Sequence, residues 1–223
     1  VTANGQRVIM YGGVYQDTVY FLVKWRDYHQ NKEHIPYVWN GKEYRKDYKN
    51  MEDGFSLNFD FKGEYASCML YGSVYQCDIW YWKSARTAPA GLALDGVMRF
   101  DGHEFPGAEA HSSHYGKPLY IGFINDAGTP VYSQQTYDKH TRDHLPQYRI
   151  NKNASGSIAD VKAVGKWKKI HWILEMSRKL NTGHPDDRVF ELGKSYHGAI
   201  AVYDSEEGQN HSVSRTINFV FPK

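Results

Sequence analysis

Residues 75–82 read YQCDIWYW, a short run in which half of the side chains are aromatic. Aromatic and β-branched residues are enriched in strands because they pack well on a pleated, half-buried surface. Similar short runs, apolar or with a period of two, recur along the chain between clusters of Gly, Asn, Asp and Pro, a pattern typical of a β-sandwich. The sequence predicts strands at residues 6–10, 18–25, 54–61, 67–71, 75–82, 120–124, 172–177, 198–203 and 214–221.

Neither an internal repeat nor an interdomain linker interrupts this pattern, so we expect one all-β domain over residues 1–223. The pattern loosens at about residues 85–153, which hold most of the prolines and many of the histidines. We expect a long irregular insertion there, of the kind that caps a pocket or contacts a partner. Residues 157–168 are predicted to contain one or two helical turns.

Charge argues against a nucleic-acid partner, and the lengths of the apolar runs argue against a membrane span. Lys and Arg number 27 against 25 for Asp and Glu, and the two signs are mixed along the chain. A nucleic-acid-binding protein would show a basic patch or stripe, and none is present. No apolar run approaches the length that spans a membrane. Residues 1–5 show no charged start followed by an apolar stretch, so an export signal is either absent or already removed.

The two cysteines flank a possible hairpin. With Gly72 and Ser73 as a two-residue type II′ turn, Cys68 would face Cys77 as a non-hydrogen-bonded pair. Such pairs bring side chains closest together, so we expect a disulfide. A disulfide implies an oxidising compartment such as a periplasm. The alternative is two buried free thiols in a cytosolic core.

Common catalytic motifs are missing. The chain has no phosphate-cradling Gly loop, no Gly-x-Ser-x-Gly elbow and no His-Glu-x-x-His helix. It also lacks Cys-x-x-Cys-His, which excludes covalent attachment of a c-type haem through two thioethers. Asp186 and Asp187 follow the turn sequence Gly-His-Pro and are expected to cap and solvate that turn, with a role as paired carboxylates as the alternative.

Several segments, in this order, resemble the haem b subunit of type II molybdoenzymes of the dimethyl sulfoxide reductase family, which contains the ethylbenzene-dehydrogenase-like haem-binding domain. They are similar to that family's early strand, Met-containing strand, Trp-x-Trp-Lys strand, late strand with its Thr-Gly turn, and last two strands. The segments are YQDTVYFLVKWRD at 15–27, CMLYG at 68–72, DIWYWKSA at 78–85, residues 172–180 with TGHPDD at 182–187, and GAIAVYD at 198–204 with GQNHSVS at 208–214.

The resemblance implies a β-sandwich related to family 9 carbohydrate-binding modules, with one non-covalent haem b between its sheets. In that family the iron is held by Met and usually by Lys. Met69 matches the Met-containing strand, and His211 stands where the family's Lys is expected. Met and His together are a ligand pair of electron-transfer haems. Lys194 and Met98 are second choices for the two ligands.

The resemblance also implies surroundings for the haem and partners for the chain. Trp80 and Trp82 are expected to wall the haem, and Lys83, Arg86 and Arg178 to meet its propionates. The chain would be a non-catalytic subunit in a periplasm or an equivalent exported compartment. Its partners would be a molybdenum catalytic subunit, an iron–sulfur subunit, and a soluble c-type cytochrome or similar carrier.

Two other functions fit the same fold. A haem-free carbohydrate-binding module would use exposed Trp pairs to stack on sugar rings. A free-standing haem module would resemble the cytochrome domain of cellobiose dehydrogenase, which also uses Met and His.

Overall fold

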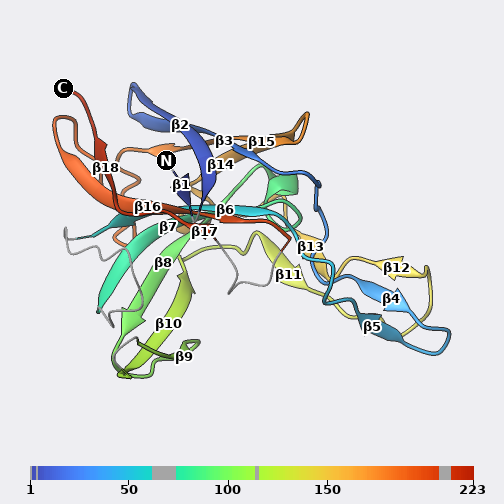
Figure 1. The fold of residues 1–223 in the computed structure, drawn as a ribbon. Helices are drawn as coiled ribbons and strands as arrows, with labels where there is room; N and C mark the ends of the chain where they lie inside the picture. Colours follow the sequence, from blue (N-terminus) through green and yellow to red (C-terminus); the bar gives the residue numbers. More distant parts are fainter. Residues whose placement is uncertain (1, 4, 62–73, 114–115, 206–211) are drawn as a thin grey trace.

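A computed structural model describes residues 2–3, 5–61, 74–113, 116–205 and 212–223 of the chain (Figure 1). Antiparallel strands dominate these residues, and the two short 3-10 turns in them are η2 (Ala88–Ala90) and η3 (Ser157–Ala159). Two sheets pack face to face around one main core. The prediction of an all-β, sandwich-like fold is confirmed.

The smaller sheet of the sandwich has the order β1-β2-β3-β15-β14. Its alternation is clearest on β3, where every second side chain from Val19 to Trp25 is buried. This is the pattern of a sheet with one face on the core and one in water. The strands are β1 (Thr2–Ala3), β2 (Gln6–Tyr15), β3 (Thr18–Arg26), β14 (Lys162–Trp167) and β15 (His171–Lys179).

The larger sheet has the order β17-β16-β6-β7-β8-β10-β9, and β18 also pairs with β16. Its central strands are buried on both faces, so they read as nearly continuous apolar runs. The strands are β6 (Gly54–Asp60), β7 (Tyr75–Lys83), β8 (Leu94–Asp101), β9 (Glu109–Ser112), β10 (Pro118–Asn125), β16 (Ser195–Tyr203), β17 (Ser212–Val213) and β18 (Ile217–Val220).

Aromatic rings fill the space between the two sheets. Trp25 stacks on Phe55 with ring centroids 5.4 Å apart, and Trp82 meets Trp172 edge-on at 4.9 Å. Pairs of this kind stabilise a core by roughly 0.5–1.5 kcal/mol beyond the area that they bury. The aromatic content of the sequence therefore serves mainly the core of the sandwich.

Two small sheets lie beyond one end of the sandwich, at the right of Figure 1. One has the order β12-β4-β5 and the other pairs β11 with β13. Their strands are β4 (Tyr37–Trp39), β5 (Tyr44–Lys46), β11 (Tyr132–Gln134), β12 (His144–Leu145) and β13 (Tyr148–Ile150).

Most of the predicted strands are confirmed, whereas the prediction for residues 67–71 lies outside the described residues. The irregular insertion is partly wrong, because β8 and β10 inside it belong to the larger sheet. The prediction of one or two helical turns in residues 157–168 is confirmed by the single turn η3, and most of the residues after it form β14. One glycine in β8 and one in β14 weaken the strand signal of these two segments. A Cβ on Gly165 would clash with the ring of Trp82, and one on Gly96 with that of Phe123.

Candidate functional site

The two predicted iron ligands, Met69 and His211, lie outside the described residues, but the strands that flank them are described. The segment that holds Met69 joins β6 to β7, and the segment that holds His211 joins β16 to β17. Asp60, the last residue of β6, leads toward the first segment. Gly54, at the other end of β6, pairs with Tyr203, which leads toward the second. The two segments therefore start at opposite ends of β6, about 20 Å apart.

The inner face of the larger sheet has no room for a haem. Trp80 and Trp82 are both fully buried, and Trp80 lies edge-on to Phe59 at 5.3 Å and to Phe21 at 5.8 Å. These rings belong to one continuous core cluster that takes in both sheets. The prediction that Trp80 and Trp82 wall a haem between the sheets is wrong, because strand alternation turns both indoles into that core.

The opposite face of the same strands, which we call the outer face, carries small side chains. Ser56 of β6, Ile79 of β7, and Ala199 and Ala201 of β16 alternate with core residues and so point away from the smaller sheet. All four are at most 5% exposed. The strands β16, β6 and β7 together span about 10 Å, which is comparable to a porphyrin macrocycle. At these four positions the outer face therefore carries smaller side chains than the aromatic inner face does.

The second-choice ligands lie in different settings. Met98 of β8 is half-buried and pairs in the ladder with Cys77, whose side chain lies on the outer face. Met98 packs against a small apolar cluster that includes Phe100 and Leu119. The Lys194 amine instead lies at the exposed surface, 2.7 Å from a Glu191 carboxylate oxygen. Of the two, only Met98 belongs to a strand of the outer face.

Cys77 carries a buried thiol whose sulfur lies 3.9 Å from the carbonyl oxygen of Met98. Burial and the nearby Asp78 and Asp60 raise the pKa of that thiol. The predicted hairpin register is wrong, because the neighbours of Cys77 in the ladder are Asp60 on one side and Met98 on the other. Cys68 lies outside the described residues, so the disulfide stays a prediction.

A polar pocket lies at the Gly54 end of the larger sheet; we call it the Lys83 pocket. Lys83 is only 8% exposed, and its amine donates a hydrogen bond to the Tyr132 hydroxyl at 3.1 Å and lies 4.3 Å from the centre of the Tyr81 ring. The lining residues are His34, Met51, Glu52, Gly54, Tyr81, Lys83, Arg86 and Tyr203. Tyr203 leads from this pocket toward the segment of His211.

Cations outnumber carboxylates in the Lys83 pocket. The single carboxylate that lines it, Glu52, forms an ion pair with Arg86 and lies 3.4 Å from His34. Burial, and then Arg86, lower the pKa of Lys83 to about 7. Burial, Arg86 and Lys83 lower the pKa of His34 to about 3, which keeps that imidazole neutral. The pocket therefore has an excess of basic groups, which favours an anion such as a carboxylate or phosphate group.

Arg178 lies on the inner face in a separate ionic cluster. Its guanidinium contacts Asp78 at 2.7 Å, Asp95 at 3.0 Å and Asp187 at 3.1 Å, and all four side chains are at most 1% exposed. These carboxylates raise the pKa of Arg178 further above its ordinary value, despite the opposing effect of burial. The carboxylates of the chain already neutralise the charge of Arg178, and its predicted contact with a haem propionate stays a prediction. Asp187 is likewise a buried ligand of Arg178 rather than a solvated turn residue.

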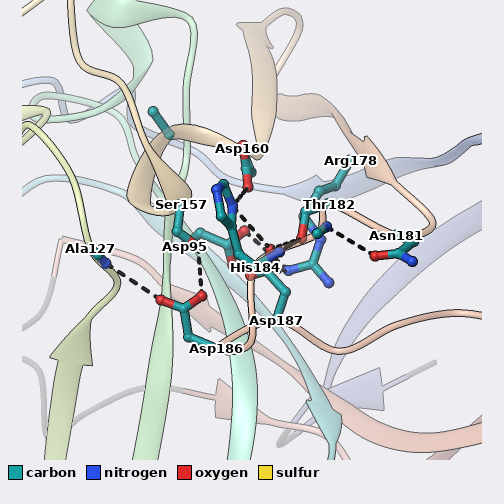
Figure 2. A network of polar contacts seen from close by, with 12 residues as sticks. Asp95, Ala127, Ser157, Asp160, Arg178, Asn181, Thr182, His184, Asp186 and Asp187 are labelled. Carbon is teal, nitrogen blue, oxygen red and sulfur yellow. Dashed lines mark hydrogen bonds and ion pairs between the residues drawn. The ribbon is translucent and has the colours of Figure 1, made fainter.

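The turn that carries Asp187 is held by further polar contacts (Figure 2). The Thr182 hydroxyl donates to Asp187, and the Ser157 hydroxyl donates to Asp186 at 2.9 Å. His184 lies 2.7 Å from Asp160, whose hydrogen bond raises the pKa of the imidazole. These contacts join the turn after β15 to η3.

Sequence reasoning missed the carboxylates around Arg178 and most of the Lys83 pocket. One signal was present: Asp78 and Asp95 interrupt apolar strands, and an acidic residue in such a position is rarely buried without a cationic partner. Nothing in the sequence indicated that His34 and Glu52 would meet Lys83, because the pocket is assembled from distant segments.

The fold and its polar sites define a β-sandwich protein with a buried ionic cluster and a pocket rich in basic groups. A profile of the ethylbenzene dehydrogenase family matches residues 4–215. The chain belongs to this family, which confirms the resemblance noted in the sequence. No curated protein matches the chain.

Family membership gives the coarse function. It indicates a cytochrome-like electron-transfer subunit of a molybdoenzyme, associated with catalytic and iron–sulfur subunits. The family in general binds haem b. Among the residues that the structure describes, no helix has the length and apolar character needed to cross a membrane.

Proposed function

We propose that this chain is the haem b subunit of an exported molybdoenzyme. It relays single electrons between the iron–sulfur subunit and a soluble c-type cytochrome or similar carrier. The observation that carries this proposal is the family match over residues 4–215, which includes both segments with the predicted iron ligands. Bound haem supplies reversible exchange between ferric and ferrous iron, and catalysis takes place in the partner.

The outer face of the larger sheet is the place that we propose for one haem. Met69 would approach from the Asp60 end of β6 and His211 from the Gly54 end, since their segments leave from those ends. Two strong axial ligands leave no open position on the iron, which suits electron transfer rather than binding of oxygen or substrate. Thioether ligation raises the reduction potential.

The Lys83 pocket is the place that we propose for the haem propionates. It lies at one end of the outer face and holds Lys83 and Arg86 with a single carboxylate, Glu52. A propionate would supply the negative charge that the buried Lys83 amine lacks among the described residues. This arrangement keeps Lys83 and Arg86 in the role predicted for them and leaves Arg178 out.

An absorption spectrum of the purified chain tests the proposal. We expect a Soret band, a low-spin spectrum and a b-type pyridine haemochrome. Met69→Ala and His211→Ala should each convert the spectrum to high-spin or empty the site, because each removes one axial ligand. The matched controls, Met98→Leu and Lys194→Ala, should keep the low-spin spectrum. An unchanged spectrum in Met69→Ala or His211→Ala would reject that residue as a ligand.

The compartment and the disulfide are part of the same proposal. Oxidation of Cys68 and Cys77 to a disulfide would fit a periplasm or an equivalent exported compartment. Mass spectrometry of the alkylated, non-reduced chain should then find both cysteines protected. Alkylation of both would contradict the disulfide and leave the haem proposal intact.

The carbohydrate-binding alternative loses its main support. A sugar-stacking site needs exposed indole rings, and none of the six Trp residues of the chain is exposed. Trp39 and Trp167 are half-buried, and the remaining four belong to the core.

A further inference from the structure

Carboxylates outnumber cations beside the Arg178 cluster. Asp78, Asp95 and Asp187 already surround the one guanidinium, and Asp126 and Asp186 lie next to them. Within the described parts of the chain, neither Asp126 nor Asp186 forms an ion pair with a Lys, Arg or His side chain. Five carboxylates therefore share one arginine and, 4.0 Å from Asp187, the imidazole of His184 in a largely buried region, and such an excess of negative charge is costly away from water.

Asp126, directly after β10, has the least satisfied carboxylate of the group. It is only 7% exposed, and its buried Oδ2 atom has no hydrogen-bond partner among the described residues. Asp126, Asp186 and Asp187 each bring one carboxylate oxygen to within 4.8 Å of the others. A buried carboxylate with an unpartnered oxygen thus lies beside two further carboxylates, an arrangement that calls for a positive charge.

A proton and a metal ion are the two ways to satisfy Asp126. Burial, together with Asp186, Asp187 and Asp78, raises the pKa of Asp126 to about 8, so a proton is a real competitor. A proton on Asp126 would neutralise one carboxylate alone. A divalent cation would serve all three at once.

We propose that Asp126, Asp186 and Asp187 bind one calcium ion. Three carboxylate oxygens form a hard donor set, and Ca²⁺ takes such ligands at about 2.3–2.6 Å. Ca²⁺ takes about 6–8 oxygen ligands in flexible geometry, so water would complete the set around these three carboxylates.

The surroundings suit an ion that keeps some water. Asp186 is half-buried and gives the site an opening to solvent, whereas Asp126 and Asp187 close its inner side. The Ser157 hydroxyl and the Ala127 amide, at 2.9 and 3.5 Å, hold the two oxygens of Asp186 in place (Figure 2). The ion would join the end of β10 to the turn between β15 and β16.

Calcium titration of the purified chain, after dialysis against a chelator, tests the site. We expect calorimetry to give one Ca²⁺ per chain. We also expect Tm to rise by about 5 °C or more at a hundredfold excess over Kd. Asp126→Asn keeps the size of the side chain and removes its charge, so the affinity should fall at least tenfold. Asp186→Asn, at a half-buried position, provides a second variant if Asp126→Asn does not fold.

The matched control is Asp27→Asn. Asp27 and Asp53 are two further buried carboxylates, and with Asp204 each brings one oxygen to within 4.8 Å of the others. Calcium affinity should be unchanged in Asp27→Asn. The proposal is overturned if the natural chain shows neither binding heat nor a Tm shift at millimolar calcium, which would leave protonation as the answer. Natural affinity in both Asp126→Asn and Asp186→Asn, or lost binding in Asp27→Asn, would overturn it too. Soret spectra of the same samples separate this result from the haem proposal.

Discussion

Arg178 and Lys83 are both buried cations that contact strand β7 or belong to it, but the protein meets their charges in different ways. Arg178 lies among three carboxylates and also donates to the backbone oxygen of Arg188 at 2.8 Å. Lys83 donates to one hydroxyl and lies near aromatic rings, while the nearest carboxylate, Glu52, is paired with Arg86. The pKa of Arg178 is accordingly raised and that of Lys83 lowered.

This difference between the two cations indicates that they have different roles. A cation whose charge is met by carboxylates of the chain serves the fold, because these ion pairs form in the folded state without a ligand. A cation that is buried without a carboxylate makes the folded state less stable, and a ligand with a negative charge can compensate for it. Arg178 therefore serves the fold, whereas Lys83 is the cation for which we propose a bound anion.

Replacement of Arg178 should have the largest effect. Arg178→Met would leave Asp78, Asp95 and Asp187 buried together without their cation, and breaking a buried ion pair in this way costs about 3–5 kcal/mol. Urea unfolding followed by circular dichroism should show this loss of stability. Lys179→Met is the matched control, because Lys179 forms a largely exposed contact with Asp17 at 3.8 Å and should change stability by less than about 1 kcal/mol. Equal losses in the two variants would contradict a structural role for the Arg178 cluster.

Replacement of Lys83 should stabilise the haem-free chain instead of destabilising it. Lys83→Met removes a buried charge that has no carboxylate partner, so the haem-free chain should gain at least about 1.4 kcal/mol at pH 7, the equivalent of one pKa unit. The same variant should retain less haem after gel filtration, because the proposed propionate site loses its amine. Lys166→Met, at an exposed position on β14, should change neither quantity. Full haem retention in Lys83→Met would contradict the propionate site.

The pH dependence of stability sharpens this test. The pKa of Lys83 falls from 10.5 to about 7 on folding, so the unfolded chain binds more protons between these two values. The contribution of Lys83 to stability should therefore rise with pH from about 7 to 10.5. Urea unfolding of the haem-free chain across this window should show a steeper rise than unfolding of Lys83→Met. Parallel curves would show that Lys83 does not titrate in this way.

The sequence predicted the strands well where apolar runs were uninterrupted. It predicted them less well where a neighbouring side chain leaves room only for glycine. The strand signal of β14 is weakened by Gly165, which is small because the ring of Trp82 lies against it. The sequence indicated Trp80 and Trp82 as walls of a haem site, whereas the structure places both in the main core. Which face of β7 is filled depends on the packing of the opposite sheet, and local sequence does not contain it.

The polar sites were less predictable because their members are far apart in the chain. Lys83 was predicted to bind a propionate from its place in the Trp-Lys segment, but His34 and Glu52 join it only through the packing of loops around the larger sheet. Asp126 likewise meets Asp186 only because the end of β10 lies beside the turn after β15. Local patterns contain no information about such contacts.

Removal of the Tyr132 hydroxyl should give the smallest and most specific effect. Tyr132→Phe keeps the ring near Lys83 but removes the oxygen that accepts the hydrogen bond from its amine. At pH 6 the Lys83 amine is charged, so the haem-free chain should lose about 1 kcal/mol. At pH 9 the amine is mostly neutral and the loss should shrink, since a neutral donor forms the weaker hydrogen bond. Tyr148→Phe, whose ring packs on Tyr132 with centroids 5.4 Å apart, should show no such dependence on pH. An equal loss at both pH values in Tyr132→Phe would mean that the hydroxyl stabilises the pocket by packing rather than by meeting the charge of Lys83.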